Sequence, residues 1–284
     1  MATKQVTCPS GLTGTLRGWK LEQVKAILDS PIGKGATNAF NRVLKAVFEP
    51  DHLGPYEAPL DWNNALLGDR AYLLIQSRML SFSGDYSVRL QCPNPACKDE
   101  NKRRTRFMWD IDLTELPVQP YSAESLATFK RDNRFTVEEA GRVYTFRLLV
   151  GADDVPTGPN PDLTEIIARR IVSVSDIGEN RKKILAHLNG LEIADLVSLL
   201  RKFDTFDGGV DTEIEAQCDE CGGVFDLNLP FERAFFLPDI RKLRLRMEVD
   251  GEETTLTTTA EATKTTDSTE AQTTSLKRPS NPPT

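Results

Sequence analysis

The sequence predicts an α+β fold with an N-terminal β-hairpin and helices, two separated cysteine-bearing β-hairpins, an inserted α+β segment and a disordered C-terminal tail. Apolar and polar residues alternate on both sides of the cysteine pairs Cys92/Cys97 and Cys218/Cys221, which is the pattern of β-strands. Before and between these pairs, apolar residues recur every three or four positions, as in amphipathic helices. From residue 251 onward the chain is rich in threonine and nearly lacks large apolar residues, so burial cannot offset the entropy of ordering it.

The composition is that of a globular protein. Of 284 residues, 39% are apolar and 27% are charged, and this length allows one large domain or two ordinary ones. The longest apolar stretches fall far short of the roughly 20 residues that cross a bilayer, so no membrane span is expected. The start of the chain lacks the continuous apolar run of a signal peptide. We therefore expect an intracellular protein in a reducing compartment, where disulfides rarely persist.

The first part of the chain is predicted to contain one hairpin and three helices. A Pro-Ser-Gly turn between two short alternating runs predicts the hairpin. Apolar residues at helical spacing predict helices over 21–28 and 40–48, the second of which ends before Pro50. A third, longer helix is expected between Asp61 and Leu80 and leads toward the first cysteine pair.

The segment between the cysteine pairs has about the usual size of a domain. A period-two pattern over 135–150 predicts another hairpin. Helical spacing over 163–203, interrupted by two glycines, predicts two or three helices, the first of which includes Ile171 and Val172. The predicted segments are an N-terminal part with the first cysteine pair, an insertion, a second cysteine pair with an aromatic C-terminal part, and the tail: 1–116, 117–209, 210–250 and 251–284.

The four paired cysteines are the strongest chemical signal in the sequence. Cys218 and Cys221 have the two-residue spacing of metal knuckles and precede two glycines that let backbone amides turn toward sulfur, whereas four residues separate Cys92 from Cys97. Two short hairpins that each supply two thiolates satisfy the tetrahedral preference of zinc with little strain. We therefore predict one structural Zn²⁺ site with these four ligands. The two hairpins would then be zinc-ribbon-like and split, since a long segment of the chain separates them.

Two other interpretations of these cysteines stay open. The spacing of Cys218 and Cys221 also occurs in redox motifs, although those usually begin a helix and this pair is flanked by strand patterns. The third interpretation is that the pairs are metal-free thiols. Cys8 has no partner in the sequence and is expected to be a small buried apolar residue.

An aromatic cluster follows the second cysteine pair. It consists of Phe231, Phe235 and Phe236. Core packing is the default interpretation for these side chains. Because aromatic residues often anchor interfaces, the alternative is that this segment docks into a partner protein.

Charge and motif content argue against nucleic-acid binding and against catalysis. A net charge of −7 and a pI near 5.1 repel phosphate on average and favour a protein partner. A basic run, Lys98 to Arg106, is the exception, although Asp99 and Glu100 dilute it. Its part from Lys102 to Arg106 leaves a zinc-ribbon nucleic-acid-binding or transcription-associated module as the alternative function. Neither histidine, His52 or His187, has a catalytic partner at fixed spacing, and residues 33–37 lack the residue order of a phosphate loop. We expect a protein that is not an enzyme.

Five short motifs resemble those of one protein family. They are Thr7-Cys8-Pro9-Ser10-Gly11-Leu12, Leu67-Gly68-Asp69-Arg70, the run from Ser81-Phe82-Ser83-Gly84-Asp85-Tyr86 into Cys92-Pro93, Cys218-Asp219-Glu220-Cys221-Gly222, and the run from Leu229-Pro230 through Phe235-Phe236. Together they extend over most of residues 1–250 and resemble the baseplate hub assembly proteins of phages with T4-like contractile tails. The wider spacing of Cys92 and Cys97 and the threonine-rich tail depart from the pattern of that family.

The resemblance implies a structural or assembly role in the baseplate of a contractile tail or a related contractile injection machine. It implies that the partners are other tail or baseplate proteins. It also implies a location in the cytoplasm of a bacterial host during assembly, and in the virion tail baseplate if the protein stays in the particle. The resemblance assigns no catalytic residue to this chain.

Overall fold

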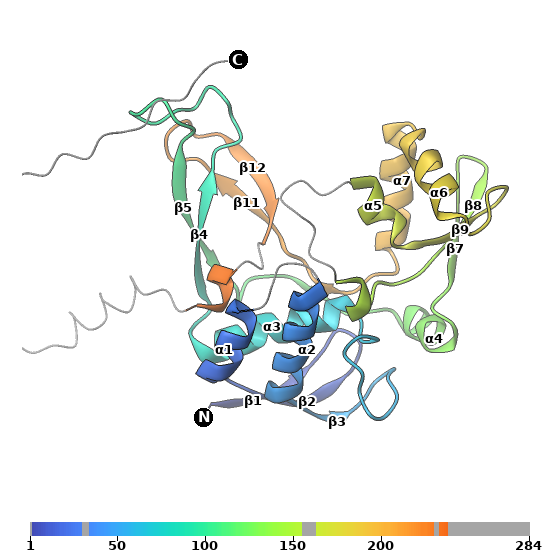
Figure 1. The fold of residues 1–284 in the computed structure, drawn as a ribbon, viewed down its shortest axis with the longest axis horizontal. Coiled ribbons are helices and arrows are strands. Elements are labelled where there is room, and N and C mark those ends of the chain that lie inside the picture. Colours follow the sequence, from blue (N-terminus) through green and yellow to red (C-terminus); the bar gives the residue numbers. More distant parts are fainter. Residues whose placement is uncertain (1, 30–33, 155–162, 230–232, 238–284) are drawn as a thin grey trace, which may run out of the picture. The chain divides into compact units, whose positions relative to one another are not determined.

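The computed structural model describes residues 2–29, 34–154, 163–229 and 233–237, which form a mixed α+β fold (Figure 1). The fold class predicted from the sequence is therefore confirmed. The predicted disordered tail, residues 251–284, lies outside the described residues.

The N-terminal sheet has three antiparallel strands in the order β1-β2-β3. The predicted hairpin is formed by β1 (Thr3–Thr7) and β2 (Thr13–Arg17), and helices α1 (Leu21–Leu28) and α2 (Lys34–Val47) follow it. The third strand, β3 (Phe48–His52), was not predicted, because a segment with Pro50 at its centre does not read as a strand. It pairs with β2 opposite Gly14, where a side chain would meet the backbone oxygen of Glu49 at 2.2 Å, so the close approach needs glycine.

Helix α3 (Leu67–Ser81) is the predicted third helix and lies on the N-terminal sheet. Its buried side chains join those of the sheet and of α2 in a first apolar core. The centre of this core is made of fully or nearly fully buried aliphatic residues: Leu12, Leu16, Val43, Leu44, Val47, Leu73, Leu74 and Ile75.

Two separate two-stranded ribbons carry the cysteine pairs. The first ribbon consists of β4 (Asp85–Gln91) and β5 (Arg106–Asp112), and the second ribbon consists of β11 (Glu213–Gln217) and β12 (Val224–Asn228). Both are antiparallel, as the alternating sequence patterns predict. They lie side by side in Figure 1, and their inner faces meet where the Phe107 and Phe225 rings pack edge to face with centroids 6.2 Å apart.

The segment between the ribbons builds a second apolar core around a three-stranded sheet. The sheet consists of β7 (Phe135–Glu139), β8 (Arg142–Phe146) and β9 (Ile171–Val174). The other elements are short, namely β6 (Val118–Gln119), α4 (Ala123–Arg131), η1 (Gly151–Asp153), α5 (Leu163–Ala168), α6 (Arg181–Asn189), α7 (Ile193–Asp204) and β10 (Gly209–Val210). The predicted hairpin and three helices are present, but Ile171 and Val172 lie in strand β9 rather than in a helix. A β-branched run fits a strand beside β8, and its apolar spacing alone does not distinguish the two structures.

The last described element, η2 (Arg233–Phe236), packs into the first core. Phe235 is 0% exposed and Phe236 is 1% exposed, and the Phe236 ring lies 5.3 Å from Trp19 and 5.4 Å from Phe40. These two side chains are therefore core residues, which agrees with the default interpretation of the sequence, and the alternative, docking into a partner, would require both rings to leave this core. Phe231 lies outside the described residues.

Candidate metal centre

The four predicted ligands meet although 120 residues separate Cys97 from Cys218. Their sulfur atoms all lie within 4.8 Å of one another. The Sγ atoms of Cys92 and Cys221 are 3.7 Å apart, and those of Cys97 and Cys218 are 3.9 Å apart. Four sulfurs that each lie about 2.3 Å from one ion at tetrahedral angles are about 3.8 Å apart, so this spacing matches a shared ion.

The first ribbon holds its two cysteines through a tight turn at its tip. Cys92 directly follows β4, and its N–H donates to the oxygen of Thr105 at 2.9 Å. The Asn94 side chain accepts from the Ala96 N–H, and the Cys97 N–H donates to the Asn94 oxygen at 3.1 Å. This turn accommodates the four-residue spacing and returns the second sulfur to the same side as the first.

The second ribbon uses glycine to close its turn. The Cys218 N–H donates to the Gly223 oxygen at 3.0 Å, and the Gly222 N–H donates to the Cys218 oxygen at 2.8 Å. Gly222 has a φ of 66°, which a side chain disfavours. A Cβ on Gly223 would lie 3.3 Å from the Cys221 sulfur, so the absence of a side chain there lets the backbone approach the ligand.

The four cysteines differ in their exposure. Cys218 is 0% exposed, Cys92 and Cys97 are also buried, and only Cys221 faces solvent. Phe107 is buried beside them, and Leu90, Trp109 and Phe225 pack around the group. The Thr105 hydroxyl lies 3.2 Å from the Cys97 sulfur, where it can donate a hydrogen bond once that sulfur is a thiolate.

The protein environment also gives the thiols different pKa values. Burial raises the pKa of the Cys92 thiol to about 12. The N–H of Gly223 donates to the Cys221 sulfur and lowers the pKa of that thiol to about 7. A metal ion that binds here must therefore displace the proton of Cys92, whereas Cys221 gives up its proton more readily.

The arrangement can hold one metal ion with four sulfur ligands. A tetrahedral set of four thiolates suits ions that accept soft ligands and disfavours Mg²⁺ and Ca²⁺, which prefer oxygen. The strands that flank Cys218 and Cys221 differ from the helix start at which thiol redox motifs usually lie.

The other residues considered from the sequence lie in structural contacts. His187 and the Tyr144 hydroxyl are 2.8 Å apart, and the exposed His52 accepts from the Gly54 N–H through Nδ1. Cys8 is 3% exposed in the first core, which confirms the prediction that it is a small buried residue.

Sequence reasoning missed a buried polar cluster around Asp69. Its carboxylate accepts from the Ser10 N–H at 3.0 Å, from the Ser10 hydroxyl, and from the Tyr56 hydroxyl at 2.6 Å. Desolvation raises the pKa of Asp69 despite these donors. Ser10 and Asp69 lie in two of the motifs that carry the family resemblance, but no pattern in either motif indicates that the two side chains meet.

Sequence reasoning also missed the contacts of Arg78, which join two further motifs of the resemblance. This arginine is 1% exposed, and its guanidinium donates to the Phe235 oxygen at 2.9 Å and to the Ser83 oxygen at 3.0 Å. It also lies 4.8 Å from the centroid of the Tyr86 ring. Arg78 thus ties η2 to the start of the first ribbon.

Comparisons of this chain with protein-family models, with curated proteins and with solved structures find no match. Among the described helices, none is long and apolar enough to cross a membrane. The fold and the site therefore define a coarse class, a mixed α+β protein with two β-ribbons that bring four cysteines to one candidate metal centre.

Proposed function

We propose that this chain is a structural or assembly protein of a phage-like contractile tail baseplate, that Zn²⁺ stabilises it, and that it acts through contacts with other tail or baseplate proteins. The observation that carries the proposal is the meeting of Cys92, Cys97, Cys218 and Cys221 across a long insertion. Four thiolates leave no open coordination position for a substrate or a water, so the proposed zinc is structural and not catalytic. The proposal is accordingly of a protein that is not an enzyme.

The contacts between the resemblance motifs support the family part of the proposal. Ser10 of the first motif bonds Asp69 of the second, and Arg78 joins the third motif to Phe235 of the fifth. The fourth motif supplies two of the four cysteines. The motifs thus hold distant parts of the chain together, so the residues that carry the resemblance are ones on which this fold depends.

The experiment deletes the gene for this chain from the phage or prophage that encodes it and images the particles by electron microscopy. We expect tails without complete baseplates, and we expect a copy with Cys8→Ala to restore them. A copy with Cys218→Ser should restore them poorly, because the zinc site is lost. Intact, infectious tails from the deletion strain would contradict the assignment.

The alternative function, a zinc-ribbon nucleic-acid-binding module, has one observation in its favour. The exposed residues Lys102, Arg103, Arg104 and Arg106 gather at the tip of the first ribbon beside the cysteines. Binding to DNA or RNA through these cations would weaken steeply as salt increases. A titration with a mixed-sequence duplex and a single-stranded RNA at several salt concentrations separates this alternative from the baseplate proposal, which expects no such binding.

A further inference from the structure

The two ribbons that carry the cysteines present opposite charges on their outer faces. Successive residues of a strand point to opposite sides, and the inner faces of the ribbons pack together through Phe107 and Phe225. The exposed residues that alternate with these along each strand therefore point away from the other ribbon. Each outer face can be defined from the register of the strands and from the exposure of the side chains.

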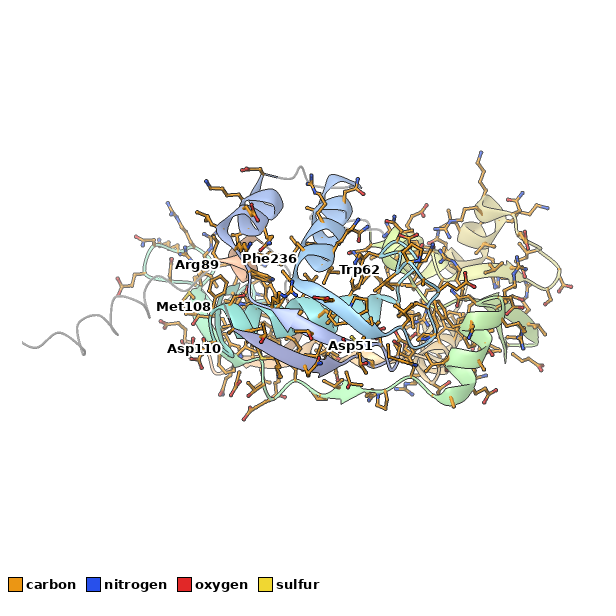
Figure 2. The ribbon with its side chains drawn as sticks, turned by 90° about the horizontal axis from the view of Figure 1, so that it is seen from below. Asp51, Trp62, Arg89, Met108, Asp110 and Phe236 are labelled. Carbon is orange, nitrogen blue, oxygen red and sulfur yellow. The ribbon has the colours of Figure 1, made fainter. Side chains whose placement is uncertain are left out.

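The first ribbon has a basic outer face near its tip. Arg89 is directly opposite Met108, and Gln91 is directly opposite Arg106, so the two arginines are diagonal neighbours. In Figure 2 the labelled side chains of Arg89 and Met108 lie on this ribbon. The turn that follows adds further exposed cations. We call this set the basic face: Arg89, Lys98, Lys102, Arg103, Arg104 and Arg106.

The second ribbon has an acidic outer face. Glu215 is directly opposite Asp226, and both side chains are exposed. Two like charges at directly opposite positions of an antiparallel pair destabilise it, so this arrangement would be relieved by positive charge brought from outside. We call this set the acidic face: Glu213, Glu215, Asp219, Glu220 and Asp226.

Ion pairs among the described residues do not neutralise either face. In the part of the chain that the structure describes, no residue of the basic face or the acidic face forms an ion pair, although nine other ion pairs are present there. The outward charges of both ribbons are thus available to a partner. Such charges give an interface its specificity and its rate of encounter.

We infer that the two ribbons mediate self-association, in which the basic face of one copy binds the acidic face of the next. The two faces are complementary in sign and belong to one module, so every copy carries both halves of the contact. Because the faces differ, the contact is heterologous, and repetition of it produces a ring if the rotation closes and a filament if it does not. The partner that this surface fits is a second copy of this chain.

The charges near the basic face favour a protein partner over a nucleic acid. Asp99 and Glu100 lie in the same turn, and Asp110 lies on the outer side of β5, two residues beyond Met108. These carboxylates would repel a phosphate backbone, whereas a mixed protein surface tolerates them. Nucleic-acid binding is therefore an outcome of the test and not part of the inference.

The test is sedimentation velocity of the zinc-loaded full chain at rising protein concentration, in salt of about 0.05 M and about 1 M, where the screening length falls to about 3 Å. We expect species larger than a dimer in low salt and monomers in high salt. A basic-face variant has Lys102→Glu, Arg103→Glu and Arg104→Glu. An acidic-face variant has Glu213→Lys, Glu215→Lys and Asp226→Lys. Each variant alone should associate at least about tenfold more weakly, because like charges then meet at every contact.

An equimolar mixture of the two variants makes the test decisive. The basic-face variant then carries two acidic faces, and the acidic-face variant carries two basic faces. The mixture should therefore associate again, as a polymer in which the two variants alternate. A control with Lys130→Glu, Lys182→Glu and Lys183→Glu has the same charge change as the basic-face variant on exposed helical positions elsewhere, and it should associate like the unaltered chain.

Three results would overturn the inference. They are a monomer at every concentration in low salt, a mixture that fails to associate, and a control that dissociates as much as the face variants. Binding of a mixed-sequence duplex or RNA by an unaltered chain that stays monomeric would assign the basic face to nucleic acid instead. The inference does not rest on the baseplate assignment, and the metal content of each variant shows that the ribbons remain folded.

Discussion

Cys218 is the ligand whose loss tests the metal centre most directly, because its sulfur is fully buried and lies 3.9 Å from that of Cys97. We expect Cys218→Ser to abolish stoichiometric zinc binding and to lower the free energy of unfolding by several kcal/mol, which is less than the roughly 10 kcal/mol that zinc contributes to isolated small modules. Elemental analysis and urea unfolding measure the two effects. Cys8→Ala is the matched control, since Cys8 is buried in another core and its loss should leave one metal per chain. Full metal content in Cys218→Ser would remove this residue from the ligand set.

The acidity of the thiols predicts how metal affinity depends on pH. The pKa of Cys92 is raised to about 12 by burial, so this thiol is protonated in the metal-free protein at all working pH values. Binding must release that proton, and the apparent affinity should therefore rise at least about tenfold per pH unit and fall as the solution becomes more acidic. The pKa of Cys221, lowered to about 7 by the Gly223 N–H, adds a further proton below neutrality and steepens the dependence there. Competition with a chelator between about pH 6 and pH 8 measures both slopes. An affinity independent of pH would contradict thiol ligation.

At the level of elements, η2 is an integral part of the first core rather than a docking segment. Truncation of Phe236 would empty the space between Trp19 and Phe40, so we expect Phe236→Ala to lower the free energy of unfolding by about 3–5 kcal/mol. Leu237→Ala is the matched control, because the adjacent Leu237 is 38% exposed and should lose less than about 1 kcal/mol. Chemical unfolding of both variants decides the matter. Equal stability of the two variants would mean that η2 leaves the core in solution.

Helix α3 meets β10 at a place where two backbones nearly touch. A Cβ on Gly68 would lie 2.4 Å from the Gly208 oxygen and 2.6 Å from the Tyr121 hydroxyl. Glycine to alanine usually stabilises a helix by about 1 kcal/mol, but here the overlap reverses the sign, and we expect Gly68→Ala to destabilise the protein by about 1–3 kcal/mol. Gly190→Ala at the end of α6 serves as the control, since its nearest contact is 3.5 Å away. Thermal unfolding of the two variants provides the comparison, and a stabilised Gly68→Ala would refute the close approach.

The elements also differ in how far the sequence predicts them. The grouping of the four cysteines was predictable because the spacing of thiolates in metal sites reflects metal chemistry directly and needs little tertiary context. Strand β3 was not, because Pro50 disfavours a strand and only pairing with β2 at Gly14 makes it one. The burial of Phe235 beside Arg78 was also beyond the sequence, since the two residues are 157 positions apart and no local pattern links them.

At the scale of the whole molecule, the insertion is closed by more than the metal centre. Strands β6 and β10 pair where the insertion leaves and returns, with Val118 opposite Val210, and the Asp211 N–H donates to the Pro117 oxygen at 2.8 Å. The second core is built almost wholly from residues of the insertion. The ends of the insertion are thus joined at two places, by the metal centre and by the pairing of β6 with β10. The entropic cost of bringing the two ends together arises only once, so when one of these closures is removed the other still holds the ends together.

This arrangement predicts that removal of the metal loosens the structure only near the cysteines. We expect a chelator to increase hydrogen exchange at the amides that close the two cysteine turns, those of Cys92, Cys218 and Gly222, because metal ligation no longer holds these turns together. Amides of α7 should keep their protection, since Leu199 and Phe203 remain buried in the second core. Exchange measured by mass spectrometry with and without the chelator tests both statements, and Cys218→Ser should reproduce the chelated pattern without any chelator. Loss of protection throughout α7 would show instead that the metal holds the entire insertion in place and that the pairing of β6 with β10 is too weak to close it.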